Sequence, residues 1–428
     1  MTPHTFLHAI QRNDIEAVEQ ALDNGMDPNM VVEAGEVSAL HAAVKAMNIE
    51  VVRSLIAHGA NVNAIDEQAR TPLHHAVSGG AAITRLLLEA GANPNVRSIE
   101  QYSPLHLALL ADRPDLETIQ ALVEAGADVN EFRGPRSLIE SATRQFASQD
   151  SADGEYDDRR TADDFSALAQ AVKMLLKHGA EPGGMALQNA FFQGRMDVVE
   201  ALVGAGAEVN NRGDLVHWAI NSKRSEHAVY LIRQGAEVNE KDHGLESSIL
   251  VCAVSAGMDD VVEAAIDAGA DLNAMDRNGW TPVLQAVADG RVAILNRLLD
   301  AGALLKPFTG TNDTLHVAAE NAKDPAMIGF LVGQGLDVNE PLNAPGQWHD
   351  GMTPLHCAAE VGNDAMLQAL LDAGADHRLT MTDGRTALDV AKEGPGRVVL
   401  EGLALRDLAE QALAAAAEPV QPRGRARL

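Results

Sequence analysis

Apolar residues recur along the chain in sets spaced by one helical turn, and polar stretches separate the sets. Val51, Val52, Leu55 and Ile56 form one such set, and an equivalent set lies within residues 198–203. This spacing places the apolar side chains on one face of an α-helix. The pattern predicts many short amphipathic helices joined by polar turns.

The helical pattern repeats over nearly the whole chain. "SALHAAVKAMNIEVVRSLIAHGANVN" from Ser38 and "TPLHHAVSGGAAITRLLLEAGANPN" from Thr71 are two of the copies. A glycine closes each copy, and most successive glycines lie about 33 residues apart. With a final incomplete copy from Thr386, the chain contains about twelve repeats. The closing glycines are Gly25, Gly59, Gly91, Gly126, Gly179, Gly206, Gly235, Gly269, Gly302, Gly335 and Gly374.

Each copy carries signals for two helices. A threonine or serine caps the first, inner helix, and proline follows at its first position, where a missing N–H has no cost. The second, outer helix carries the paired apolar residues, and the closing glycine suits the left-handed position after it. One copy cannot bury its apolar face alone, so the copies are expected to stack into a solenoid.

These features resemble the ankyrin-repeat family. Its T-P-L-H-x-A motif is present at Thr71–Ala76 and Thr353–Ala358, and at Ser103–Ala108 with serine first. The resemblance implies an all-α solenoid of about twelve helix-turn-helix repeats. It also implies short turns, here called fingers, that project between successive repeats beside the inner helices.

Departures from the repeat divide the chain further. The interval from Gly126 to Gly179 contains an acidic insertion, residues 147–165, and the two fingers that follow it are short. The insertion is either a solvated loop or an arm that grips a basic partner. The expected segments are 1–135, N-terminal repeats with a capping repeat; 136–183, a degenerate repeat with the insertion; 184–245, short-finger repeats; 246–416, C-terminal repeats with a capping helix; and 417–428, a basic disordered tail.

His356 and Cys357 are adjacent, as a thiol enzyme with a histidine base could require. The histidine position recurs in most repeats, however, which indicates a part of the scaffold. In the family it forms hydrogen bonds between neighbouring turns. No zinc-binding spacing of cysteine or histidine is present, so we expect no catalytic site, no metal and no cofactor. The recurring histidines are His8, His41, His74, His106, His217, His316 and His356.

Composition narrows the classes of partner. The net charge is −28, which keeps a long molecule soluble or attracts a basic partner. No basic stripe could neutralise phosphates, so we expect no nucleic-acid binding. The chain shows no signal peptide and no apolar run long enough for a bilayer. We therefore expect a soluble cytoplasmic protein without a membrane contact, as a monomer.

Large side chains on the fingers are candidate partner contacts. Tyr102, Trp280 and Met352 each directly precede a capping residue, and Trp348 lies in the long finger 339–354. Tryptophan and tyrosine dominate binding hot spots because they bury a large area with few rotatable bonds. The alternative is that these rings only pack on adjacent fingers. The expected partner-binding residues are Tyr102, Trp280, Trp348, Met352, Arg277 and Arg70.

The sequence therefore predicts a non-catalytic scaffold or adaptor that binds another protein on the concave face formed by inner helices and fingers. Two alternatives remain open. One is a dedicated inhibitor or immunity protein for a basic enzyme, and the other is a bacterial effector that binds a host protein. An inhibitor would have one tight, salt-sensitive partner, whereas an adaptor would have several partners of moderate affinity.

Overall fold

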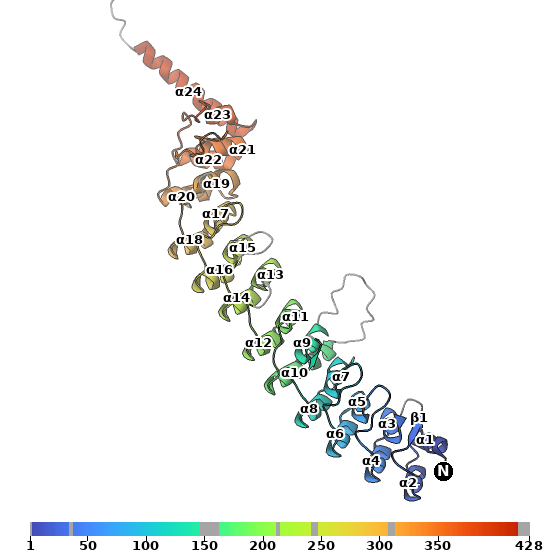
Figure 1. Ribbon diagram of the computed structural model, residues 1–428. Helices are drawn as coiled ribbons and strands as arrows, with labels where there is room; N and C mark the ends of the chain where they lie inside the picture. The colour runs from blue at the N-terminus through green and yellow to red at the C-terminus, as the bar shows by residue number, and fades with distance from the viewer. Residues whose placement is uncertain are drawn as a thin grey trace, which may run out of the picture. The chain divides into compact units, whose positions relative to one another are not determined.

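The computed structural model describes residues 2–33, 37–134, 136–145, 162–210, 215–240, 247–306 and 313–417 (Figure 1). The chain forms two compact units, Met1–Gly213 and Asp214–Leu428. Their division falls inside the short-finger segment expected at 184–245. Each unit is a stack of helix pairs, and the described residues contain 24 helices, as an all-α ankyrin-repeat solenoid of about twelve repeats requires.

In unit 1, six helix pairs follow one another along the stack. Inner helices contact the next inner helix, such as α3 and α5, and outer helices contact the next outer helix, such as α6 and α8. The helices are α1 Pro3–Gln11, α2 Ile15–Asp23, α3 Ala39–Lys45, α4 Ile49–Ala57, α5 Pro72–Ala76, α6 Ala81–Glu89, α7 Pro104–Leu110, α8 Leu116–Glu124, α9 Leu138–Arg144, α10 Ala162–Lys177, α11 Ala186–Phe192 and α12 Met196–Gly204.

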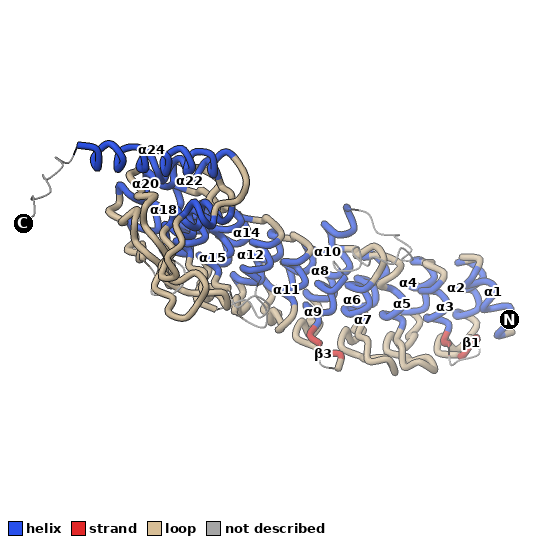
Figure 2. Tube along the Cα trace, turned by 90° about the horizontal axis from the view of Figure 1, so that it is seen from above, coloured by secondary structure: helices blue, strands red, loops and turns tan. Residues whose placement is uncertain are grey.

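Unit 2 repeats the arrangement and ends with the longest helix, α24, which extends away from the last repeats (Figure 2). Its helices are α13 Leu215–Asn221, α14 Ser225–Arg233, α15 Ile249–Ala256, α16 Asp259–Asp267, α17 Pro282–Ala288, α18 Val292–Asp300, α19 Thr314–Asn321, α20 Ala326–Gly333, α21 Pro354–Val361, α22 Asp364–Asp372, α23 Ala387–Val390 and α24 Pro395–Ala417.

Local sequence explains where the inner helices begin. Ser38 accepts a hydrogen bond from the His41 N–H, and Ser103 accepts one from the His106 N–H. Thr71 and Thr353 form capping boxes, each with proline at the first helical position. These caps satisfy backbone donors that a helix start leaves open. The predicted capping role of these residues is confirmed.

The core lies between the inner and outer helices of each repeat. Leu73 of α5, Leu87 of α6 and Leu105 of α7 are fully buried, as is Ile119 of α8. Because each repeat buries its apolar face against its neighbours, the stack behaves as one continuous core within a unit.

The fingers vary in length as the sequence indicates. Residues 178–185 join α10 to α11, whereas the longer stretch 58–71 joins α4 to α5. Two fingers form small antiparallel hairpins, β1 Val31–Glu33 with β2 Val37–Ser38 and β3 Phe132–Arg133 with β4 Arg136–Ser137. The connection between α20 and α21, residues 334–353, contains neither helix nor strand and includes all of the long finger 339–354 except Pro354.

Two expected segments lie largely or wholly outside the described residues. These are the acidic insertion 147–165, of which only the backbone of 162–165 is described, and the tail 417–428, of which only the backbone of 417 is described. Within the described parts of the chain, no helix combines the length and the hydropathy that a bilayer span requires.

Candidate protein-binding surface

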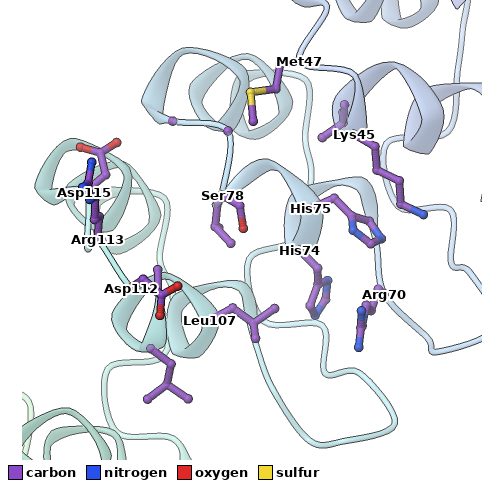
Figure 3. A pocket seen from close by; sticks show the side chains of 16 residues that line it. Lys45, Met47, Arg70, His74, His75, Ser78, Leu107, Asp112, Arg113 and Asp115 are labelled. Atoms are coloured by element: carbon purple, nitrogen blue, oxygen red, sulfur yellow. The ribbon is translucent and has the colours of Figure 1, made fainter. Parts of the chain in front are cut away.

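An open groove crosses the inner helices of unit 1, with a volume of about 1350 Å³ (Figure 3). We call it the α3–α5–α7 groove. In Figure 3, Lys45, Arg70, His74 and His75 gather on one side, and Asp112, Arg113 and Asp115 lie on the opposite side. The residues that line the groove include Lys45, Met47, Arg70, His75, Leu107 and Arg113.

The groove exists because the inner helices end there. α3 ends at Lys45, and the chain turns back toward α4 through Met47, whose φ is 57°. Side chains at such a turn lie beyond the core, and Met47 is 58% exposed. Gly79 and Gly80 occupy the corresponding turn after α5, and the lack of side chains there keeps the groove open. An exposed methionine is a flexible apolar contact that suits a varied partner surface.

The two cations on opposite sides of the groove are unpaired. Neither Lys45 nor Arg113 makes a hydrogen bond or an ion pair within the described residues. Arg70 is 3.8 Å from the Glu100 carboxylate, a distance that leaves the guanidinium weakly held. Both carboxylate oxygens of Asp115 accept hydrogen bonds at the start of α8, one from the Glu117 N–H and one from the Thr118 hydroxyl. The groove therefore carries three cations, Lys45, Arg70 and Arg113, against the two carboxylates of Asp112 and Asp115, so that it has a small excess of positive charge in a strongly acidic chain.

The wall of the groove near Lys45 contains an ordered histidine. His75 Nε2 lies 3.0 Å from Oδ2 of Asp66, which is buried in the adjacent finger. Burial, together with the charge of Lys45, lowers the pKa of His75 to about 4 despite this carboxylate. Burial raises the pKa of Asp66, but hydrogen bonds from the Arg70 and Gln68 N–H groups and from His75 bring it below its usual value. His75 is therefore neutral at neutral pH.

His41, Asp66 and His75 place their potential ligand atoms within 4.8 Å of one another. Hydrogen bonds account for this cluster. The Ser38 N–H donates to His41 Nδ1 at 3.3 Å, so the proton of the ring resides on Nε2, which donates to the Arg70 carbonyl at 3.0 Å. A protonated nitrogen cannot bind a metal. The cluster joins α3, the finger and α5, and we interpret it as structural.

Both predicted partner-binding residues of unit 1 lie near this groove, and one lines it. Arg70 is half-buried in the lining. Tyr102 is half-buried in the next finger, where its carbonyl accepts a hydrogen bond from His74 and its ring meets His106 edge-on at 5.4 Å. Lys45, Met47, His75 and Arg113 were not among the predicted residues.

In unit 2, Arg277 is exposed and lines a smaller groove with Lys223 and Gln285. Trp280 belongs to the same finger and is half-buried, and its backbone N–H donates to Asp276 Oδ1 at 2.8 Å. Trp348 is 64% exposed and contacts His349 edge-on at 5.3 Å.

The expectation that Met352 is an exposed contact is wrong, because its side chain is only 1% exposed. The long finger folds back on itself here. The Leu342 N–H donates to the Met352 carbonyl at 2.7 Å, and the Gly351 N–H donates to the Leu342 carbonyl at 2.9 Å. The side chains of Leu342 and Met352 are both buried in this closed loop. Met352 therefore holds the finger together and is not available to a partner.

His356 and Cys357 do not form a catalytic pair. His356 Nδ1 lies 2.8 Å from the Thr353 hydroxyl, and Nε2 lies 3.2 Å from the Arg385 carbonyl of the next finger. Burial strongly raises the pKa of the Cys357 thiol, and the nearby Glu320 raises it further, so no reactive thiolate forms at neutral pH. The predicted scaffold role of this histidine is confirmed.

Comparison with known proteins agrees with this geometry. The family model "Ankyrin repeats (3 copies)" matches residues 6–98, 164–242, 216–308 and 315–401, and the model "Ankyrin repeat" matches residues 100–132. Together these matches cover well over half of the chain.

Three relatives show the same kind of similarity over part of their lengths. The transient receptor potential cation channel subfamily A member 1 of Homo sapiens is 25% identical over 91% of this chain and 38% of its own. The palmitoyltransferase ZDHHC13 of Homo sapiens is 27% identical over 51% of this chain and 34% of its own, within the ankyrin region. The mitochondrial disaggregase of Bos taurus is 33% identical over 31% of this chain and 19% of its own length. The chain thus spans well under half of each relative, and by its repeats it belongs to the ankyrin-repeat family.

Proposed function

We propose that the chain is a non-catalytic scaffold of the cytoplasm that binds another protein on the surface formed by its inner helices and fingers. Ankyrin repeats suggest protein–protein interaction. The observation that carries the proposal is the α3–α5–α7 groove, where exposed Met47 lies among the unpaired cations Lys45 and Arg113. Methionine and arginine are enriched at protein interfaces, whose apolar core is surrounded by a polar rim.

The groove also bears on the kind of partner. Lys45, Arg70 and Arg113 favour a segment that carries carboxylates at this place, and steering by these cations would be salt-sensitive. The net charge of −28 instead favours a basic partner elsewhere on the molecule. An inhibitor of a basic enzyme, or an effector acting on a host protein, would therefore contact another surface than this groove.

The test is a pull-down from the lysate of the source organism at low and high salt. The groove variant Lys45→Ala/Met47→Ser/Arg113→Ala is expected to lose the partner that the wild type captures. Arg12→Ala/Lys177→Ala is the matched control, because it removes one arginine and one lysine that are exposed elsewhere in unit 1. Capture that the groove variant leaves unchanged contradicts the assignment of the partner to this groove.

The fingers of unit 2 offer a second contact within the same function. Trp348, at 64% exposed, is the best anchor there, and Trp280 and Arg277 share the finger that lies two repeats earlier. A Trp280→Ala/Trp348→Ala variant tests this surface in the same experiment. If the wild-type protein captures a single partner and high salt releases it, the chain is better explained as an inhibitor. If it captures several partners that remain bound at high salt, the chain is better explained as an adaptor.

A further inference from the structure

We propose that α24 pairs in parallel with α24 of a second copy of this chain, forming a homodimer through a two-stranded coiled coil. The proposal is independent of the function assigned to the grooves. It replaces the monomer that was expected from the sequence.

The first observation is an apolar face that the repeats leave uncovered. One side of α24 docks on unit 2, where Leu400 is buried and Asp407 binds Arg378 at 2.6 Å and His377 at 2.9 Å. The helix extends beyond the last repeats (Figure 2). Four of its large apolar side chains are 61–71% exposed, namely Val398, Leu405, Leu408 and Leu413.

The exposed face has the spacing of a coiled-coil seam. Val398, Gly402, Leu405, Ala409 and Ala412 follow one another at alternating steps of four and three residues, and all five are exposed. Alternating steps of this kind define positions a and d of a heptad, which face the partner helix. Glycine and alanine at position a allow the two helices to approach closely.

The residues beside the seam identify the occupant as a second copy. In this register Glu401 occupies position g and Arg406 occupies position e, five residues later. In a parallel pair, position g of one helix faces position e of the other five residues later, so Glu401 meets Arg406 of the second copy. The same rule sets Leu408 against Leu413 of the second copy. Both lateral contacts are thus complementary, charge with opposite charge and apolar with apolar.

The complementarity also sets the orientation. An antiparallel pair would place position e against position e, and Arg406 would then meet Arg406 or Leu413 of the other helix. Within α24, Glu401 lies 3.0 Å from Arg397 and Arg406 lies 3.2 Å from Glu410, so each charge keeps its local partner in the monomer. Parallel pairing adds the contact between Glu401 and Arg406 of the second copy to these ion pairs, and it leaves no charged side chain without a partner of opposite charge.

The first test measures the mass of the full chain in solution by light scattering over a dilution series. The wild type is expected to be a dimer that dissociates on dilution, and Leu405→Glu is expected to be a monomer. Ile99→Glu is the matched control, because Ile99 and Leu405 are both 66% exposed and the new charge is the same. A monomeric wild type at all concentrations overturns the proposal, and so does a Leu405→Glu variant that stays dimeric.

The second test addresses orientation and covers the case that Leu405→Glu fails to fold. Glu401→Arg is expected to weaken the dimer by about tenfold in its dissociation constant. Adding Arg406→Glu should restore the affinity, because the charges then face each other in exchanged order. Val398→Cys should form a disulfide between the two copies on oxidation, since a parallel pair aligns identical residues. A dimer that shows neither the restoration nor the cross-link refutes parallel pairing.

Discussion

In five of the described repeats, the histidine at the repeated inner-helix position joins the repeat to the next finger. His41 Nε2 lies 3.0 Å from the Arg70 carbonyl, and His74 Nε2 lies 3.1 Å from the Tyr102 carbonyl. The same contact recurs from His217 to Ser247, from His316 to Met352 and from His356 to Arg385. Burial lowers the pKa of His41, His74 and His356, so these donors are neutral at physiological pH.

Acid should destabilise the chain through such buried histidines, and His75 gives the clearest case. Burial lowers its pKa from 6.5 to about 4. The unfolded chain therefore binds more protons between these values, and the free energy of unfolding falls as the pH drops below 6.5. His75 alone should account for up to about 3 kcal/mol of this loss, at about 1.4 kcal/mol per pKa unit. Urea unfolding of wild type and His75→Gln across this range should give a flatter pH dependence for the variant. Equal slopes would contradict the buried, neutral state of His75.

Two finger residues adopt a backbone conformation that favours glycine. Ala69 has a φ of 57° and Gln101 has a φ of 65°, at the place in the finger where Gly279 has a φ of 79°. A side chain in this region costs about 1 kcal/mol or more. Ala69→Gly and Gln101→Gly should each raise the free energy of unfolding by about 0.5–1 kcal/mol, measured by urea denaturation. Gly279→Ala is the reverse control and should lower it, whereas an unchanged midpoint in all three would refute the strain.

At the scale of elements, asparagines fasten each finger turn to the following repeat. Asn95 Oδ1 accepts from the Asp128 N–H at 2.8 Å, and its Nδ2 donates to the Gly126 carbonyl at 3.0 Å. Asn29, Asn63, Asn130 and Asn239 make the same two contacts with their own next repeats. The asparagine thus acts between repeats, as the histidine does on the opposite side of the finger.

Removal of one such asparagine should loosen the contact between two repeats. Asn95→Ala deletes both hydrogen bonds and leaves two backbone groups unpaired, so the free energy of unfolding should fall by about 1–2 kcal/mol. Hydrogen exchange of the Gly126–Asp128 turn should speed up in the same variant. Glu67→Ala, at an exposed finger position, is the control and should change neither quantity. A neutral Asn95→Ala would show that stacking of the helices alone sets the register.

The sequence predicts this fold well because the repeat contains its own signals. Capping residues, closing glycines and the recurring histidine each mark one place in the repeat, and the structure confirms their roles. The long finger has no such pattern, so the sequence could not show that it closes around Met352. Lys45 and Arg113 were not predicted because the residues at the turn after an inner helix differ from repeat to repeat. These two side chains line one groove only when the repeats stack. The exposed face of α24 was hidden for a related reason, since the expectation of a capping helix does not specify which side the repeats cover.

At the scale of the whole molecule, the net charge of −28 opposes folding, because a compact chain brings like charges together. The ion pairs of the described residues offset little of this repulsion. Arg85 with Glu117 and Arg297 with Glu263 are exposed pairs at 3.3 Å, and such pairs contribute about 0–1 kcal/mol each. The net negative charge of the chain therefore remains largely unbalanced.

Salt should accordingly stabilise the protein. The screening length falls from about 30 Å at 0.01 M to about 8 Å at 0.15 M ionic strength, so repulsion between distant carboxylates is largely removed while hydrogen bonds inside the repeats are unaffected. The midpoint of thermal unfolding should rise when sodium chloride is added over this range at neutral pH. Near the sequence pI of about 4.8 the net charge vanishes, and the same addition should then have little effect. A midpoint that falls with salt at neutral pH would mean that exposed ion pairs outweigh the net repulsion, and the acidic surface would then have to be explained by its partner and not by solubility.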